Sequence, residues 1–148
     1  MWARKTTYFV VVLSLVFVDS VLWLAITGAK DKATCPARVN GQCLEVEAVS
    51  SKQDQAVGLS KYQSYSDNKA MLFDFGTPKT ACMWMKNMKF SIDMVWVNGQ
   101  NKITKIEKNV TPGTYPQTFC ADNTSYVLEL NSGAATKAGL SVGQRLSL

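Results

Sequence analysis

The stretch CMWMKNMKFSIDMVWVNGQ, residues 82–100, decides how this chain folds. It holds four of the six methionines and two of the four tryptophans, beside Lys86, Asn87 and Asp93. Apolar residues at this density are typical of a core. Polar residues set among them need partners or line a site, because burying them unpaired costs free energy. The stretch therefore contains both core positions and the first candidate site residues.

Alternation of side chains within this stretch predicts two strands. Met83 and Met85 share one strand face, with Cys82 and Trp84 on the other. In the second strand two sets of side chains take opposite faces: Ile92, Met94 and Trp96 against Asp93, Val95 and Val97. The Asn98-Gly99 pair that follows is a hairpin turn signal, and we expect the chain to return through residues 102–106.

Further short strands and helices are predicted on both sides of this stretch. The predicted strands are residues 44–49, 70–75 (ending at Gly76 and Pro78), 125–130 and 142–148. Two short helices are predicted, one over residues 53–57 with Ser50 or Ser51 as cap and Gly58 as stop, and one over 134–138 with Asn131 or Ser132 as cap and Gly139 as stop. Many short strands with frequent turns indicate a mainly β fold, a compact sandwich or barrel with one or two short helices.

An apolar run near the amino terminus predicts a membrane helix. Residues 8–27 have the length of about 20 mostly apolar residues that a spanning helix needs, and Arg4 and Lys5 precede them. The alternative is a signal peptide cleaved near residues 27–29, although the run is longer than the usual signal core of about 7–15 residues. A buried core helix is the third reading. Asp19 lies within the run. A single membrane helix can tolerate such a carboxylate, or the residue can form a contact in an oligomer.

All four cysteines follow that run, which indicates disulfides in an exported domain. Three pairings are open. We favour Cys35–Cys43, closing a short loop, and Cys82–Cys120, tying two distant strands. Zinc is disfavoured because the chain has neither histidine nor a C-x-x-C spacing, so we expect no metal and no cofactor.

Composition excludes several other classes of function. The chain has sixteen Lys and Arg and eleven Asp and Glu, which gives a net charge of +5. The basic residues are scattered and do not interleave with aromatic residues, so no nucleic-acid partner is predicted. The lack of histidine excludes a serine triad, and no phosphate loop or dinucleotide fingerprint is present. A weak attraction to anionic lipid headgroups fits the mildly basic balance.

A set of short motifs, in order along the chain, resembles the domain-of-unknown-function 192 family, also called uncharacterised protein family 0127. The motifs are Gly58-Leu59, residues 71–75 (MLFDF), 84–87 (WMKN), 92–94 (IDM), 127–131 (VLELN) with Gly133, and finally Gly139 and Gly143. Three positions depart from the family pattern, namely Ala70, Met88 and Ser91. The resemblance covers roughly residues 44–148. It implies a compact, mainly β domain that often follows an export signal or anchor, and it implies no reaction.

Lys86, Asn87, Asp93 and Trp84 form the predicted ligand-binding set. A pocket in which Lys86 and Asn87 meet an anionic or carbonyl group, oriented by Asp93, competes with a structural reading in which Asp93 pairs with a lysine or accepts backbone N–H bonds. Glu129, between two leucines, is expected to point out from its strand or to pair with a lysine. No catalytic residue is assigned.

Together these observations predict three regions: an anchor or signal segment over 1–29, a linker and disulfide loop over 30–43, and a β-rich extracytoplasmic domain over 44–148. The predicted function is a membrane-anchored binding or envelope-associated module, with the membrane and an unknown small-molecule or envelope ligand as partners. One alternative is a hydrolase of an envelope polymer using Asp93 or Asp74. The other is copper(I) binding through Met83, Met85 and Met88, since thioethers bind this ion; gap-filling core methionines compete with it.

Overall fold

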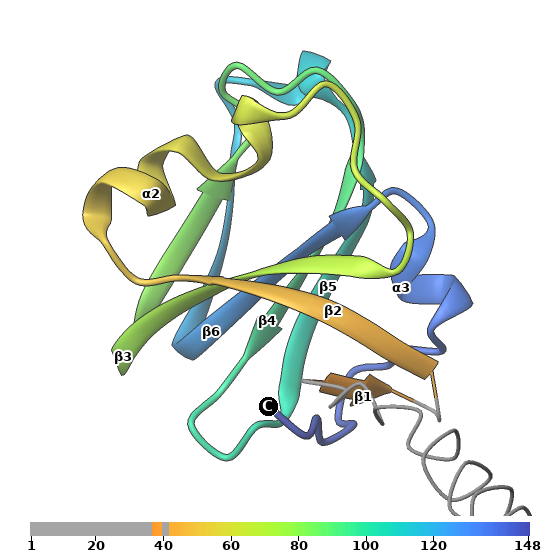
Figure 1. Ribbon diagram of the computed structural model, residues 1–148. Coiled ribbons are helices and arrows are strands. Elements are labelled where there is room, and N and C mark those ends of the chain that lie inside the picture. Colours follow the sequence, from red (N-terminus) through yellow and green to blue (C-terminus); the bar gives the residue numbers. More distant parts are fainter. Residues whose placement is uncertain (1–36, 40–41) are drawn as a thin grey trace, which may run out of the picture. The chain divides into compact units, whose positions relative to one another are not determined.

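The computed structural model describes residues 37–39 and 42–148 (Figure 1). The secondary structure of this part is mainly β, as predicted, with short helices between the strands. In chain order the elements are β1 (Ala37–Val39), β2 (Gln42–Val49), α2 (Lys52–Val57), the 3-10 helix η1 (Gly58–Lys61), β3 (Lys69–Trp84), β4 (Ile92–Val97), β5 (Ile103–Val110), the 3-10 helix η2 (Pro112–Thr114), β6 (Thr118–Asn131) and α3 (Ala134–Lys137).

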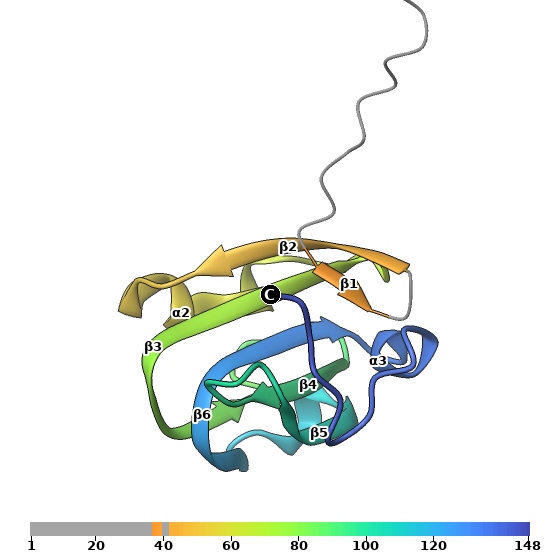
Figure 2. The ribbon, with the colours of Figure 1, turned by 90° about the horizontal axis from the view of Figure 1, so that it is seen from below.

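The described strands form one sheet in the order β1-β2-β3-β6-β4-β5. β2 and β3 pair in parallel, and the other neighbouring strands pair antiparallel. Figure 2 shows β3 and β6 curving strongly, so that β2 and β3 lie above β4, β5 and β6. The prediction of a mainly β domain with short helices is confirmed, and the curvature of one sheet produces the layering.

β3 is much longer than the sequence pattern predicts. It does not end at Gly76 and Pro78; it bends there and continues to Trp84, pairing with β6 on both sides of the bend. The register shifts between Asp74 and Lys79, and Gly76 has a φ of +70°, which glycine adopts without strain. The Asp74 carboxylate accepts a hydrogen bond from the Gly76 N–H at 2.8 Å, so this carboxylate holds the bend.

The core lies on both faces of the sheet. Val95, Val97 and Leu128 pack on one face together with α3, while Met94 and Trp96 pack on the other. Every residue of β4 is buried, and the predicted division of its side chains between two faces is confirmed. In the last part of β3 the predicted alternation is confirmed as well: Met83 and Met85 are buried, and Cys82 and Trp84 are exposed.

The two α-helices end as the sequence predicts but do not both begin that way. Ser51 caps α2 by accepting the Asp54 N–H at 3.0 Å, and Gly58 follows its last residue. The predicted cap of α3 at Asn131 or Ser132 is wrong. Its N-cap is Gly133, which offers no side chain, and the Asp93 carboxylate from β4 accepts the Ala135 N–H instead.

The hairpin between β4 and β5 and the carboxyl-terminal segment both contact the start of β5. The predicted hairpin at Asn98 is confirmed, although its loop is longer than two residues: the Asn98 carboxamide oxygen accepts the N–H groups of Gln100 and Lys102. The predicted strand over 142–148 is wrong. That segment is not an extended strand: it forms an isolated bridge between Lys102 and Arg145 and backbone hydrogen bonds with Asn101 and Ile103.

The predicted membrane segment, residues 8–27, lies outside the described residues, as does Cys35 of the predicted Cys35–Cys43 pair. Among the residues that the structure describes, no helix is long and apolar enough to cross a membrane.

Candidate functional site

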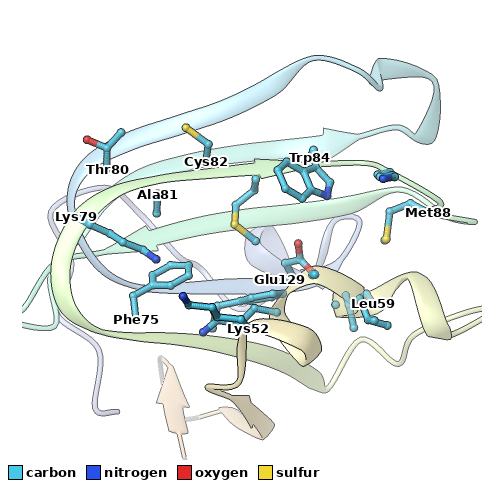
Figure 3. A pocket seen from close by; sticks show the side chains of 17 residues that line it. Lys52, Leu59, Phe75, Lys79, Thr80, Ala81, Cys82, Trp84, Met88 and Glu129 are labelled. Atoms are coloured by element: carbon cyan, nitrogen blue, oxygen red, sulfur yellow. The ribbon is translucent and has the colours of Figure 1, made fainter.

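A cavity of about 290 Å³ opens between α2, η1, the two arms of β3 and the end of β6. Apolar side chains make most of its wall, including Phe75, Met83, Trp84 and Met88. Figure 3 shows Phe75 and Lys79 at one end of the cavity, Trp84, Met88 and Leu59 at the other, and Glu129 between them. The bend of β3 creates the space, because the strand supplies both Phe73 and Phe75 before the bend and Lys79 to Trp84 after it.

Glu129 on β6 is the one carboxylate among the described residues that line the cavity. Its side chain is 4% exposed, and it forms no ion pair with any residue that the structure describes. The Leu59 N–H donates a hydrogen bond to the carboxyl group, but Oε2 is buried without any hydrogen-bond partner. A buried polar atom without a partner is rare in folded proteins and requires an explanation.

Burial gives this carboxyl group an unusual proton affinity. Loss of hydration raises the pKa of Glu129 to about 8, against a smaller lowering by the Leu59 N–H. The side chain is therefore mostly protonated at neutral pH. In that form one oxygen can donate a hydrogen bond, and an acid with this proton affinity is the kind that binding sites and active sites use.

The strand pattern of β6 and a glycine on η1 place Glu129 at the cavity. Val127 and Glu129 face the same side of the sheet, while Leu128 and Leu130 face the other. Gly58 lies beside the carboxyl group with a φ of +49°. A Cβ at Gly58 would lie 3.5 Å from Oε2 of Glu129 and 3.2 Å from Cζ of Phe73, so a side chain at this position would contact both the carboxyl group and the Phe73 ring.

Three lysines line the cavity: Lys52 from α2, Lys79 from β3, and Lys86 from the turn after β3. All three are exposed. Among the described residues they form no ion pair, whereas Lys61 and Lys137, which lie elsewhere, pair with carboxylates. Lys79 Nζ lies 4.0 Å from the centroid of the Phe75 ring, a cation–π contact that holds it at the mouth. The site thus combines an apolar wall, a basic rim and one buried carboxyl group.

Residues 35–148 match the model of DUF192, described as an uncharacterized ACR. The chain belongs to the DUF192 family. No curated protein matches the chain. Among solved structures it is similar to a Sinorhizobium meliloti 1021 protein described as a candidate transcription regulator, with 30% identity, a TM-score of 0.69, and coverage of 75% of this chain and 88% of that one.

A Novosphingobium aromaticivorans DSM 12444 protein of unknown function has the same fold, at 24% identity and a TM-score of 0.69 over 76% of this chain and 82% of that one. The structural match covers most of both similar chains, so the fold occurs in chains without a large additional domain. The described elements of our chain form one compact unit over residues 35–148, and this unit is suited to experiments in isolation.

The DUF192 structure brings together part of the ligand-binding set predicted from the sequence. Trp84 and Lys86 both line the cavity, and the Trp84 side chain is 45% exposed. Asn87 does not line it. This residue has a φ of +61° in the turn after β3, where asparagine tolerates a left-handed backbone better than most residues do. Ligand binding by Trp84 and Lys86 stays a prediction, and Asn87 shapes the turn that presents Lys86.

Asp93 lies away from the cavity and is completely buried. Its Oδ1 accepts the Asn109 N–H at 2.9 Å, and its Oδ2 accepts the Ala135 N–H at 2.9 Å. These bonds match the structural alternative for Asp93, acceptance of backbone N–H groups. They tie β4 to the end of β5 and to the start of α3.

The other sequence candidates in this DUF192 domain have separate positions. Asp74 holds the β3 bend and does not line the cavity. Met83 and Met88 line the cavity, whereas Met85 is buried in the core and does not. Among the described residues, no cluster of three or more His, Cys, Asp or Glu side chains could hold a metal ion. Copper(I) binding through the methionines stays a prediction.

Cys82 and Cys120 stand opposite each other in the register of β3 and β6 and are joined by a disulfide, with their Cα atoms 4.0 Å apart. The bridge fixes the outer arms of these two strands, and Cys82 contributes to the cavity wall. The disulfide therefore supports the same β3 arm that carries Met83 and Trp84.

Sequence reasoning missed Glu129 as the central polar group of the site. The expectation that it points outward or pairs with a lysine is wrong, because it is buried and pairs with no lysine in residues 37–39 and 42–148. One signal was available. In the run Val127-Leu128-Glu129-Leu130 both strand faces are apolar, so a glutamate on either face must enter a core or a cavity.

Proposed function

We propose that this DUF192 domain is a small-ligand binding module whose site is the cavity around Glu129. The observation that supports the proposal most directly is the buried carboxyl group with an unpartnered oxygen in a partly apolar cavity. Small-molecule sites combine apolar walls with a few convergent polar groups, often with perturbed proton affinities. A bound ligand would give Oε2 of Glu129 the partner that the protein does not provide.

The test is a fragment screen against residues 35–148, followed by NMR shifts of the backbone N–H groups around Leu59 and Glu129 and of the Trp84 indole. Ligands of the cavity are expected to shift these signals together. Ala56→Trp places a large side chain at an exposed cavity-lining position of α2 and should abolish binding. Gln53→Trp, exposed on the same helix but not lining the cavity, is the matched control and should retain it. Equal binding by both variants would contradict the proposal.

A hydrolase acting on an envelope polymer is the second candidate, and Glu129 favours it as the acid. The sequence alone offers Asp93 or Asp74, but both carboxylates accept backbone N–H groups away from the cavity. A general acid works best when its pKa lies near the working pH, and the pKa of Glu129 is raised to about 8. Product release from isolated cell-envelope material by the wild type, but not by Glu129→Gln, would establish this reading over simple binding.

We also propose that the domain is held at the outer side of a cell membrane by residues 8–27. The support is the length of the apolar run and the basic residues before it. Protease added to intact spheroplasts that express the full chain should digest the domain. In untreated cells, the full chain should be recovered in the membrane fraction. Recovery of a mature chain beginning near residue 30 in the soluble fraction would instead support a cleaved signal.

A further inference from the structure

We infer that the cavity takes a small anionic amphiphile, bound with its acidic group at the lysine rim and a neutral hydrogen-bond-accepting oxygen against Glu129. The inference rests on the proposed function and specifies its ligand. Each part of such a ligand corresponds to one part of the site: the rim, the wall and the floor.

The rim selects for negative charge. Lys52, Lys79 and Lys86 approach the cavity from separate segments, and among the described residues none of them has a carboxylate partner. The one cavity-lining carboxylate of the described chain, Glu129, is buried, whereas the three lysines are exposed. Three ammonium groups around one opening attract an anion and repel a cation.

The wall selects for an apolar body. Phe75 and Trp84 lie toward opposite ends of the cavity, and Met83 and Met88 belong to the same lining (Figure 3). Trp84 remains 45% exposed without a ligand, so a bound apolar chain would remove part of a large aromatic surface from water. Thioether side chains adapt to different apolar shapes, which suits an unbranched chain.

The floor selects for a neutral acceptor. The protonated Glu129 can donate one hydrogen bond, and burial, the largest influence on its pKa, favours this uncharged form. A ligand hydroxyl or carbonyl oxygen can accept that bond. A ligand ammonium would need the ionised carboxylate and would also meet the three lysines. Tyr65 also interacts electrostatically with Glu129. The floor and the rim therefore disfavour a cation in the same way.

Four single-chain probes separate these contributions: octanoate, 8-hydroxyoctanoate, 1-octanol and octylamine. Their affinities for residues 35–148 are measured by isothermal titration calorimetry at pH 6.5. We expect 8-hydroxyoctanoate to bind most tightly, about tenfold better than octanoate, because its terminal hydroxyl reaches a buried partner. Octanol should bind more weakly than octanoate, and octylamine least. Raising the salt concentration should lower the affinity for octanoate and 8-hydroxyoctanoate and leave the affinity for octanol nearly unchanged.

Variants assign the effects to residues. Replacing Lys52, Lys79 or Lys86 singly by Gln should lower the affinity for octanoate by roughly two- to fivefold. Lys108→Gln is the control, since Lys108 is exposed and does not line the cavity. Glu129→Leu should reduce the roughly tenfold preference for 8-hydroxyoctanoate over octanoate to about twofold or less, and its thermal transition shows that it folds.

The outcomes separate the inference from the proposed function. If octylamine or octanol binds as tightly as octanoate, the ligand class is wrong, but the cavity still binds ligands. If no probe binds while the fragment screen finds ligands sensitive to Ala56→Trp, the ligand class is again wrong. If neither the probes nor the fragments bind, both proposals fail.

Discussion

Glu129→Gln provides the most direct test of how this domain is built, because it removes one titrating proton from the core at nearly constant shape. The pKa of a glutamate in an unfolded chain is about 4.3, whereas burial raises that of Glu129 to about 8 in the folded domain. Between these two values the folded state holds a proton that the unfolded state has released.

The sign of the effect follows from this difference. Stability changes with pH in proportion to the protons bound by the unfolded state minus those bound by the folded state, which here is minus one. The free energy of unfolding should therefore fall as pH rises, by about 1.4 kcal/mol per pH unit and by about 4 kcal/mol from pH 5 to pH 8. Below pH 4 both states are protonated and above pH 9 both are ionised, so the curve flattens at each end.

Few other groups titrate within this window. The chain has no histidine. Among the described residues, the pKa values of Glu47 and Asp67 are lowered by lysine and neutral hydrogen-bond partners, and those of Lys61 and Lys69 are raised by glutamates, which places their effects below and above the window. The slope between pH 5 and pH 8 is therefore assigned to Glu129.

The assay is urea unfolding of residues 35–148 and of the Glu129→Gln variant at five pH values from 5 to 9, followed by tryptophan fluorescence. The wild type should lose stability across the window, while the variant should change by less than about 1 kcal/mol. The two curves should converge or cross as pH rises. Parallel curves, or a wild-type curve that is flat, would refute the assignment of a buried, protonated Glu129.

Three further substitutions test separate contacts by the same urea assay. Asp93→Ala should destabilise the domain by roughly 3 kcal/mol, because it leaves the buried Ala135 N–H and the part-buried Asn109 N–H without their acceptor; unchanged stability would show that these bonds contribute nothing. Replacing Cys82 and Cys120 together by Ala opens a loop with a sequence separation of 38 and should lower stability by roughly 4 kcal/mol in the chain-entropy model; unchanged stability would show that the bridge does not constrain the unfolded chain. Gly58→Ala should cost about 1 kcal/mol or more through its positive φ and should weaken cavity ligands, whereas Gly113→Ala, with a nearest contact of 3.9 Å, should do neither; ligand affinity that survives Gly58→Ala would show that Oε2 of Glu129 is not contacted.

Local patterns in the sequence predict the strands of this domain better than their pairing. The division of β4 into two buried faces follows from period-two alternation, and the structure has that division. The parallel pairing of β2 with β3 leaves no local trace, since it depends on which strands meet in space. The continuation of β3 past Gly76 was missed for the same reason: glycine and proline normally end a strand, but pairing with β6 keeps this one extended on both sides of the bend.

Local sequence patterns also predict only part of the residues that line the cavity. Trp84 and Lys86 attract attention because they adjoin a dense apolar run, and they line the cavity. Lys52 and Lys79 carry no such signal, because a lysine on a short helix or beside a bend is ordinary in sequence. The fold brings them to the same opening through α2 and the returning arm of β3, and only the tertiary structure contains that information.

The two buried carboxyl groups on neighbouring strands, Asp93 and Glu129, differ in how far the fold provides their hydrogen-bond partners. Asp93 and Glu129 are adjacent in the sheet, since Asp93 pairs with Leu130 and Met94 pairs with Glu129, yet they face opposite sides. Each oxygen of Asp93 accepts a backbone N–H, so the fold itself explains why an aspartate is buried there. Glu129 is also buried among apolar side chains, but it accepts only one such bond. Its raised pKa makes the fold less stable as pH rises, a cost that a leucine at this position would remove. A group that weakens the fold and lines a cavity is better explained by what enters the cavity than by the fold around it.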